Sequence, residues 1–205
     1  MGPMTGPVQS WSKRYEDEDT PWDLGRPHPD LVTRMPELLD YLGRTSSRRA
    51  FVPGCGRGHD AEALARAGLE VTAVDVVPGL ASRVRTRLAP WGGNFSWEDA
   101  LLHRPEEPYE LVWEHTFFCA LDPEDRPGYG AMARRCLCRG GVLAGVLFPV
   151  GKPEAWGGPP FGVTVEALAQ ALGPGFRKLR DEPAAQPIEA RSWKERWVVF
   201  EKTGD

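Results

Sequence analysis

The chain has 205 residues, a formal net charge of −4 and 41% hydrophobic residues. This length bounds it to one domain, or one domain with a long extra segment, and allows a core without disulfides. The charge gives no electrostatic case for nucleic acid, and no stretch approaches the roughly 18 apolar residues of a transmembrane helix. The 23 Gly and 20 Pro indicate long loops, whereas the 8 Trp argue against disorder.

The N-terminal segment divides into two parts. Residues 1–10 are small and broken by proline, so we expect a disordered arm, and residues 11–28 carry aromatic and charged side chains without a clear period. The segment lacks a signal-peptide pattern, and the four cysteines form no C-x-x-C pair. We therefore expect a cytoplasmic monomer with neither a metal site nor disulfides.

The rest of the chain alternates between strands and helices. Strands are predicted over Arg49–Pro53, Leu69–Val74, Asn94–Trp97, Tyr109–Trp113, Val142–Phe148, Phe176–Leu179 and Trp193–Glu201. Helices are predicted over Asp30–Tyr41, with a kink near Pro36, from His59 to Gly68, and from Pro78 to Leu88. Two more are predicted from Asp122 to about Leu137, where Arg139-Gly140-Gly141 would end the helix, and over Val165–Leu172, where Thr164 would be the N-terminal cap. This alternation predicts a doubly wound, mainly parallel α/β sheet in one domain from residue 11 to 205.

A glycine loop follows the first predicted strand. Gly54, Gly56 and Gly58 lie between that strand and a helix, where glycine permits a sharp turn and close approach of a ligand. The spacing is G-x-G-x-G, and His59 stands where the dinucleotide fingerprint has its third glycine. The loop therefore favours a cofactor without a pyrophosphate over NAD or NADP.

Acidic residues follow the next two strands. Asp75 ends the second strand, 17 residues after Gly58, and a carboxylate there can accept hydrogen bonds from both hydroxyls of a ribose. Glu98 and Asp99 follow the third strand, where a polar side chain could meet an adenine amino group. The order of strand, glycine loop, helix, strand and acid indicates a nucleoside-containing cofactor.

At these residues the chain resembles the class I S-adenosylmethionine (SAM)-dependent methyltransferases and, more narrowly, the thiopurine S-methyltransferase family, with its bacterial thiol, tellurite and halide methyltransferase-like members. The resemblance implies a Rossmann-like, seven-stranded sheet whose last strand is antiparallel. It covers nearly the whole chain, in Trp11 with Tyr15, Thr20-Pro21-Trp22-Asp23, Val52 to Gly58, Asp75, Trp113 to Thr116, Cys119-Ala120-Leu121, Arg126 with Tyr129, Gly157 to Phe161, and Ser192-Trp193.

The resemblance also implies roles for individual residues. Residues 11–28 would form a lid, with Trp11 against the cofactor and Trp22 on the acceptor side. An aromatic lid suits this chemistry, because aromatic faces attract the sulfonium cation and exclude water. The cofactor-binding set would be Trp11, Trp22, Gly54, Gly56, Gly58, Asp75, Glu98, Asp99 and Glu114.

Two residues are candidates for catalysis. His115 is the best candidate for a base, since its ordinary pKa lies near neutrality, although the interpretation as a hydrogen-bonded pocket residue is slightly favoured over it. Arg126 could stabilise an anionic acceptor or could lie exposed on a first helical turn. Some family members have Arg where His115 stands, which leaves open how this chain would hold an anion.

We therefore predict a SAM-dependent methyltransferase that yields S-adenosylhomocysteine and acts on a small-molecule acceptor. A thiol or other soft sulfur nucleophile is the preferred acceptor, because a thiolate attacks an activated sulfonium with little help beyond positioning. The alternatives are N- or O-methylation of a small metabolite and a module that binds SAM without catalysis.

Overall fold

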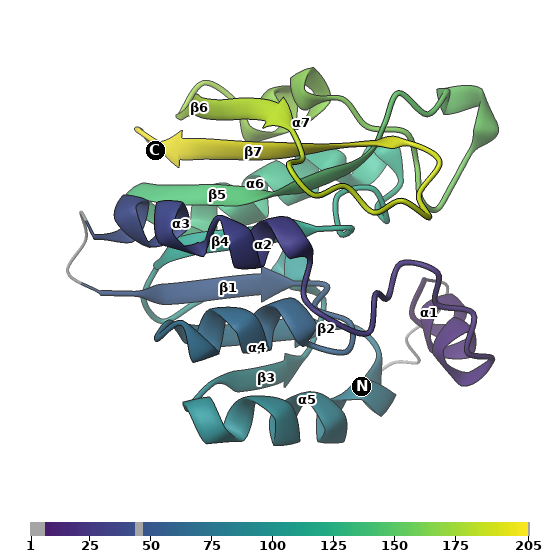
Figure 1. Ribbon diagram of the computed structural model, residues 1–205, viewed down its shortest axis with the longest axis horizontal. Helices are drawn as coiled ribbons and strands as arrows, with labels where there is room; N and C mark the ends of the chain where they lie inside the picture. The colour runs from purple at the N-terminus through teal and green to yellow at the C-terminus, as the bar shows by residue number, and fades with distance from the viewer. Residues whose placement is uncertain (1–6, 44–46, 205) are drawn as a thin grey trace.

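The computed structural model describes residues 7–43 and 47–204 and places one seven-stranded sheet at the centre of the molecule (Figure 1). The strand order is β3-β2-β1-β4-β5-β7-β6. The strands are β1 (Arg49–Pro53), β2 (Glu70–Asp75), β3 (Asn94–Trp97), β4 (Tyr109–His115), β5 (Leu137–Val150), β6 (Phe176–Pro183) and β7 (Lys194–Lys202). β1 to β5 pair in parallel, and β7 runs antiparallel to both neighbours, which confirms the predicted Rossmann-like sheet.

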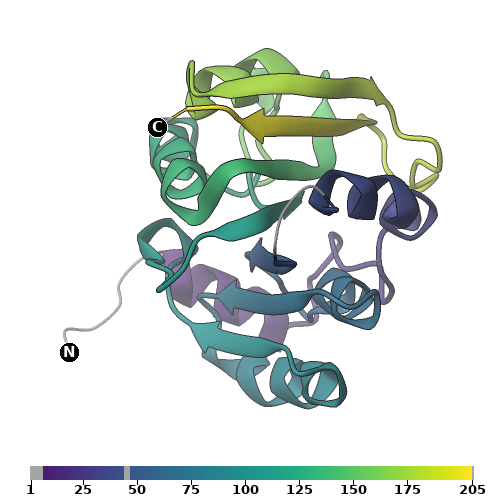
Figure 2. The ribbon, with the colours of Figure 1, turned by 90° about the vertical axis from the view of Figure 1, so that its left-hand side faces the viewer.

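Helices cover both faces of the sheet (Figure 2). α2 (Pro29–Thr33), α3 (Met35–Leu42), α4 (His59–Arg66) and α5 (Ala81–Leu88) pack with one hydrophobic cluster, and α6 (Arg126–Cys136) and α7 (Val165–Leu172) pack with the other. β5 contributes to both clusters, because alternate side chains of a strand point to opposite faces. Short 3-10 turns are η1 (Pro78–Leu80), η2 (Ala89–Trp91), η3 (Ala100–Leu102), η4 (Pro123–Asp125) and η5 (Glu154–Trp156).

Two helix boundaries follow directly from local sequence chemistry. Pro36 lies in the first turn of α3, so the predicted helix over Asp30–Tyr41 is divided into α2 and α3 at Arg34. Thr164 caps α7 as predicted, because its hydroxyl accepts a hydrogen bond from the backbone N–H of Ala167 at 3.0 Å.

The end of α6 differs from the prediction. The helix ends at Cys136 and β5 begins at once, so Arg139-Gly140-Gly141 lie inside the strand rather than ending the helix. The buried Lys202 ammonium donates to the carbonyls of Arg134 at 2.8 Å and Leu137 at 3.1 Å. These bonds satisfy C-terminal carbonyls of the helix without a glycine cap.

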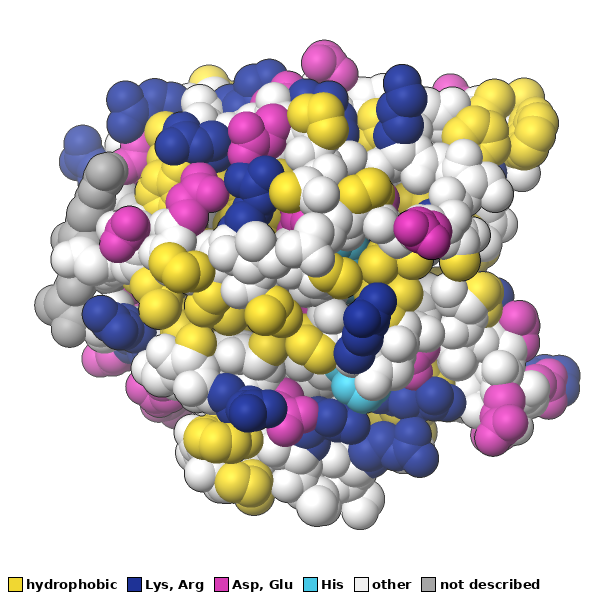
Figure 3. Space-filling model, in the orientation of Figure 1, with side chains coloured by type: hydrophobic (Ala, Val, Ile, Leu, Met, Phe, Trp, Pro, Cys, Tyr) yellow, Lys and Arg dark blue, Asp and Glu magenta, His cyan; other side chains and the backbone are white. Residues whose placement is uncertain are grey.

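The N-terminal segment lies beyond the carboxyl ends of the parallel strands. α1 (Pro7–Glu16) and the chain to residue 28 cross this edge, while residues 1–6 of the expected disordered arm lie outside the described residues. The outline in Figure 3 is hollowed at its right-hand edge, between α1 and the loop after β5, and acidic and basic side chains are mixed over the face shown. No helix in the described part of the chain is long and apolar enough to cross a membrane.

Candidate cofactor and acceptor site

The glycine loop connects β1 to α4 with all three glycines in the left-handed region, at φ values of 57° for Gly54, 54° for Gly56 and 77° for Gly58. At Gly54 a Cβ would overlap the ring of Phe117, so only glycine fits there. Gly58 has a different surrounding, because a Cβ would lie 3.1 Å from Val84 of α5. Gly54 and Gly56 therefore face the site, whereas Gly58 allows two helices to pack closely.

Asp75 holds the glycine loop against the end of β2. Its carboxylate accepts hydrogen bonds from the backbone N–H groups of Gly56 at 2.9 Å and Val77 at 3.0 Å. Burial raises the pKa of Asp75, and these two bonds partly oppose that rise. The side chain is 7% exposed and lines the large cavity described below.

The two acids after β3 occupy different surroundings. Asp99 lines the large cavity and accepts the backbone N–H of Leu101 at 2.9 Å, which fixes the turn η3. Glu98 instead pairs with Nδ1 of His103 at 3.0 Å, and the other ring nitrogen of that histidine lies 2.9 Å from the Tyr109 hydroxyl. The structure therefore brings Asp99 to the cavity, whereas Glu98 supports the turn beside it.

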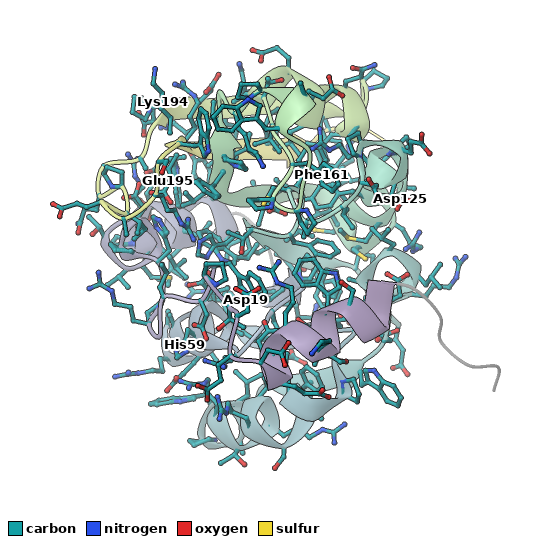
Figure 4. The ribbon with its side chains drawn as sticks, turned by 90° about the vertical axis from the view of Figure 1, so that its right-hand side faces the viewer. Asp19, His59, Asp125, Phe161, Lys194 and Glu195 are labelled. Carbon is teal, nitrogen blue, oxygen red and sulfur yellow. The ribbon has the colours of Figure 1, made fainter. Side chains whose placement is uncertain are left out.

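A large cavity of about 720 Å³ extends along the carboxyl edge of the sheet. Figure 4 looks onto this edge, with α1 in front and with Asp125, Phe161 and Glu195 labelled around it. A second cavity of about 60 Å³ shares Tyr15, Trp22, Gly54 and Thr116 with the first. Lining residues of the large cavity include Trp11, Asp75, Asp99, Phe117, Cys119, Phe148, Pro159, Pro160, Arg191 and Trp193.

Aromatic contacts and one ion pair hold the N-terminal segment (residues 11–28) against the large cavity and the glycine loop. Trp22 meets the rings of Trp11 at 5.2 Å and Tyr15 at 5.7 Å, both edge to face, and its indole N–H donates to the Tyr15 hydroxyl at 3.2 Å. Asp23 accepts a hydrogen bond from Arg57 of the glycine loop at 2.8 Å. Trp11 and Trp22 therefore form one wall of the cavity, and Arg57 ties that wall to the loop.

Glu114 lies beneath the loop that follows β4. Its buried carboxylate accepts the backbone N–H groups of Phe117 at 3.0 Å and Phe118 at 2.9 Å, and the Tyr129 hydroxyl at 2.8 Å. These bonds hold a loop in which Thr116 adopts a φ of 62°, a strained value for a β-branched residue. Burial raises the pKa of Glu114 to about 7. Its carboxylate shapes the loop that borders both cavities.

His115 lies in a row of hydrogen-bonded side chains. Its Nδ1 lies 2.7 Å from Asp60, and its Nε2 lies 3.3 Å from both terminal guanidinium nitrogens of Arg191. Burial lowers the pKa of His115, although the Asp60 carboxylate opposes that effect. Both ring nitrogens therefore have protein partners.

Arg191 is a central residue that sequence reasoning missed. It lies in the loop between β6 and β7 and pairs with Glu195, and its side chain is only 7% exposed. The guanidinium also stacks on Phe148 at 4.5 Å and approaches the carbonyl of Trp22 at 3.4 Å. Arg191 therefore supplies a positive charge to the large cavity beside the lid.

Arg126 has a different surrounding from the one expected. Its guanidinium donates to the carbonyl of Gly162 at 2.9 Å and stacks on Phe118 at 4.8 Å, and it is not among the described residues that line either cavity. Burial lowers the pKa of Arg126. The contact with Gly162 ties α6 to the loop that carries Pro159 and Pro160.

The large cavity fits a nucleoside-bearing sulfonium cofactor. Two carboxylates, Asp75 and Asp99, line the part of the edge formed by β2 and β3, and the glycine loop follows next. Trp11 and Trp22 offer aromatic faces, which stabilise a desolvated cation. Within the described residues, no group of three metal-binding side chains comes together.

The fold has well-matched counterparts among solved structures. The Burkholderia thailandensis 1,6-didemethyltoxoflavin-N1-methyltransferase, solved with S-adenosylhomocysteine, superimposes with a TM-score of 0.75 at 18% identity, over 100% of this chain and 93% of that one. A family model described as "Methyltransferase domain" matches residues 53–141. Fold and site together define a SAM-dependent methyltransferase with a Rossmann-like sheet.

Sequence relatives narrow this class. The family model for thiopurine S-methyltransferase matches residues 7–87. "Thiocyanate methyltransferase 1" of Arabidopsis thaliana is 34% identical over 94% of this chain and 84% of the relative, and "Probable thiol methyltransferase 2" of the same plant is 33% identical over 91% and 83%. The chain therefore belongs to the thiopurine S-methyltransferase family, and its cofactor is SAM.

Proposed function

We propose that this enzyme methylates the sulfur atom of a small thiol or a similarly soft anion. The observation that carries the proposal is the position of Arg191, whose buried guanidinium lines the same cavity as the acids suited to the cofactor. A cation there stabilises an anionic acceptor, whereas it would repel an ammonium group. The printed names of two relatives, a thiocyanate and a thiol methyltransferase, support the same chemistry.

We place the cofactor along the edge from β3 to β4. Asp75 would bind the ribose hydroxyls and Asp99 the adenine, while Gly54 and Gly56 would lie against the methionine part. Trp11 and Trp22 would cover the sulfonium from the lid side. The other predicted residues would act from behind this layer, with Glu98 supporting the η3 turn, Glu114 the loop after β4, and Gly58 the packing of α4 and α5.

When bound, SAM supplies a methyl group already activated on a sulfonium. The protein has to orient the acceptor sulfur in line with that methyl group and to keep water out. Arg191 would hold the acceptor's negative charge, and Phe117 and Phe148 would provide apolar walls. The acceptor lone pair forms the new carbon–sulfur bond, and the electrons of the broken bond return to the cofactor sulfur, leaving S-adenosylhomocysteine.

The test is methyl transfer from labelled SAM to a panel of small acceptors. The panel contains an aliphatic thiol, an aromatic thiol, thiocyanate, iodide, an amine and a catechol. We expect transfer to at least one sulfur acceptor with higher kcat/KM than to the amine or the catechol. Turnover confined to the amine or the catechol would overturn the sulfur assignment and support the N- or O-methylation alternative.

We further propose that the enzyme works in the cytoplasm as a monomer. All four cysteines are free, and three of them have pKa values raised chiefly by burial to an extent that disfavours the thiolate: Cys55, Cys119 and Cys136. Free cysteines without disulfide bonds are typical of proteins in a reducing compartment. Light scattering of the purified chain at micromolar concentration tests the monomer, and a dimer mass would contradict it.

A further inference from the structure

Three elements bring Asp60, His115 and Arg191 into one hydrogen-bonded row. Asp60 lies in the first turn of α4, His115 ends β4, and Arg191 belongs to the loop between β6 and β7. The side chains of these residues are 12%, 10% and 7% exposed, respectively. Such a row fixes the orientation of its last member through the first two.

The hydrogen bonds of Asp60 determine which ring nitrogen of His115 carries a proton. Besides its contact with Nδ1 of His115, the carboxylate accepts hydrogen bonds from Nε1–H of Trp113 at 2.9 Å and from the backbone N–H of His28 at 2.8 Å. Although burial opposes a charge here, the hydrogen bonds that Trp113 and the backbone of His28 donate lower the pKa of Asp60. An ionised carboxylate only accepts, so Nδ1 of His115 must be the donor.

Arg191 determines the state of the other ring nitrogen. A guanidinium only donates, and both of its terminal nitrogens lie 3.3 Å from Nε2. Nε2 must therefore accept, which requires a neutral ring. Other titratable groups near this row include His28, whose ring centroid lies 5.0 Å from that of His115, Glu195, which pairs with Arg191, and Cys119, which lines the large cavity with Arg191.

We propose that Asp60 and His115 are positioning residues that aim the Arg191 guanidinium at an anionic acceptor, and that His115 is not the base that deprotonates it. This inference rests on the proposed sulfur methylation. The remaining contacts of Arg191 agree with it, because Glu195, Phe148 and the Trp22 carbonyl hold the guanidinium from other directions.

Two acceptors distinguish positioning from base catalysis. Thiocyanate has no proton to lose near neutral pH, whereas a thiol must first become a thiolate. With positioning, His115→Ala lowers kcat/KM by about 10- to 100-fold for both acceptors, the scale of a lost hydrogen bond to a charged group. A loss confined to the thiol, with methylation of thiocyanate intact, would overturn the proposal.

A conservative variant tests the hydrogen bonds themselves. In His115→Gln the amide can donate to Asp60 or accept from Arg191 but cannot serve as a base at neutral pH, so we expect it to recover part of the activity lost in His115→Ala. Asp60→Asn should lower kcat/KM with both acceptors. Glu62→Gln, a matched change on the same helix at the partly buried pair with Arg87, serves as the control. Failure of His115→Gln to recover any activity would count against the row.

A spectroscopic measurement tests the hydrogen bonds of the row even if no sulfur acceptor reacts. Long-range ¹H–¹⁵N spectra report the protonation of the four histidine rings, and the His115 signals are assigned by their absence in His115→Gln. Between pH 6 and 8, the range in which an ordinary histidine titrates, His115 should be neutral with its proton on Nδ1. A ring that is cationic, or that carries its proton on Nε2, overturns the positioning row. Absence of turnover with every sulfur acceptor would instead overturn the proposed function.

Discussion

At the scale of single residues, Asp75 joins the wall of the large cavity to the glycine loop. Its carboxylate already accepts two backbone N–H groups and is still positioned to face the large cavity. The same residue can thus order Gly56 and bind a ribose, because a carboxylate has about four lone-pair positions.

Replacing Asp75 should weaken cofactor binding. We expect Asp75→Ala to reduce the affinity for S-adenosylhomocysteine by about 1–3 kcal/mol, the cost of losing a charged hydrogen-bond partner. Titration calorimetry measures this change directly. Glu70→Ala, at the exposed other end of β2, is the control and should bind as the wild type does. If Asp75→Ala and the wild type bind S-adenosylhomocysteine with equal affinity, our placement of the ribose is wrong.

Glu114 gives a second prediction at this scale, on pH and stability. Its folded-state pKa of about 7 lies above the unfolded value, so its stabilising contribution is complete below about pH 4.5 and is lost as pH rises through 7. A shift of this size corresponds to roughly 3 kcal/mol. Glu114→Gln imitates the protonated carboxyl, since its amide can donate to the Tyr129 hydroxyl while its oxygen accepts the two backbone N–H groups.

Urea unfolding at pH 5.5 and pH 8 tests this assignment. The free energy of unfolding of the wild type should fall relative to that of Glu114→Gln between the two pH values. Comparing the two proteins removes the contributions of the other titrating groups to the pH dependence of the free energy of unfolding. One such group is His115, whose lowered pKa makes the protein more stable as pH rises. A constant difference between wild type and variant at both pH values would show that Glu114 is already ionised at pH 5.5.

At the scale of elements, the N-terminal segment (residues 11–28) and the glycine loop are joined by direct contacts. Trp22 contacts Trp11 and Tyr15, and Asp23, the next residue, pairs with Arg57. The family resemblance implied a lid over residues 11–28, but the sequence showed no period from which α1 could be predicted. The ion pair was also hidden, because Asp23 and Arg57 are 34 residues apart and only the fold brings them together.

Removal of the central lid tryptophan should loosen the lid and weaken cofactor binding. Trp22→Ala loses two aromatic contacts and a hydrogen bond, so we expect S-adenosylhomocysteine to bind more weakly by about 1–3 kcal/mol. Hydrogen exchange of residues 7–28 should slow on ligand binding in the wild type and much less in the variant. Lys13→Ala, at an exposed position of α1 in the same N-terminal segment, should resemble the wild type. Identical protection in Trp22→Ala would contradict a lid role.

At the scale of the whole molecule, sequence periodicity predicted all seven strands and their parallel majority, because buried strands and glycine loops leave strong local signals. The prediction of helix ends failed where tertiary contacts replace local ones. At the end of α6, Lys202 donates the hydrogen bonds to backbone carbonyls that a glycine cap was expected to supply. Sequence reasoning likewise missed Asp60 and Arg191. The first resembled an ordinary acid in a helical first turn, and the second lay in a loop with no pattern to place it beside His115.

The proposed cofactor site spans β1, β2, the loop after β4 and the N-terminal segment, so ligand binding should stabilise the whole fold. At a concentration about 100 times its Kd, S-adenosylhomocysteine should add about 2.7 kcal/mol to the free energy of unfolding. For a chain of this size that corresponds to a rise in Tm of roughly 5–10 °C, measured by calorimetry. NAD at the same concentration should leave Tm unchanged, because His59 replaces the third glycine of the dinucleotide fingerprint. A comparable rise with NAD would mean that the cavity accepts a pyrophosphate and would contradict the interpretation of the glycine loop.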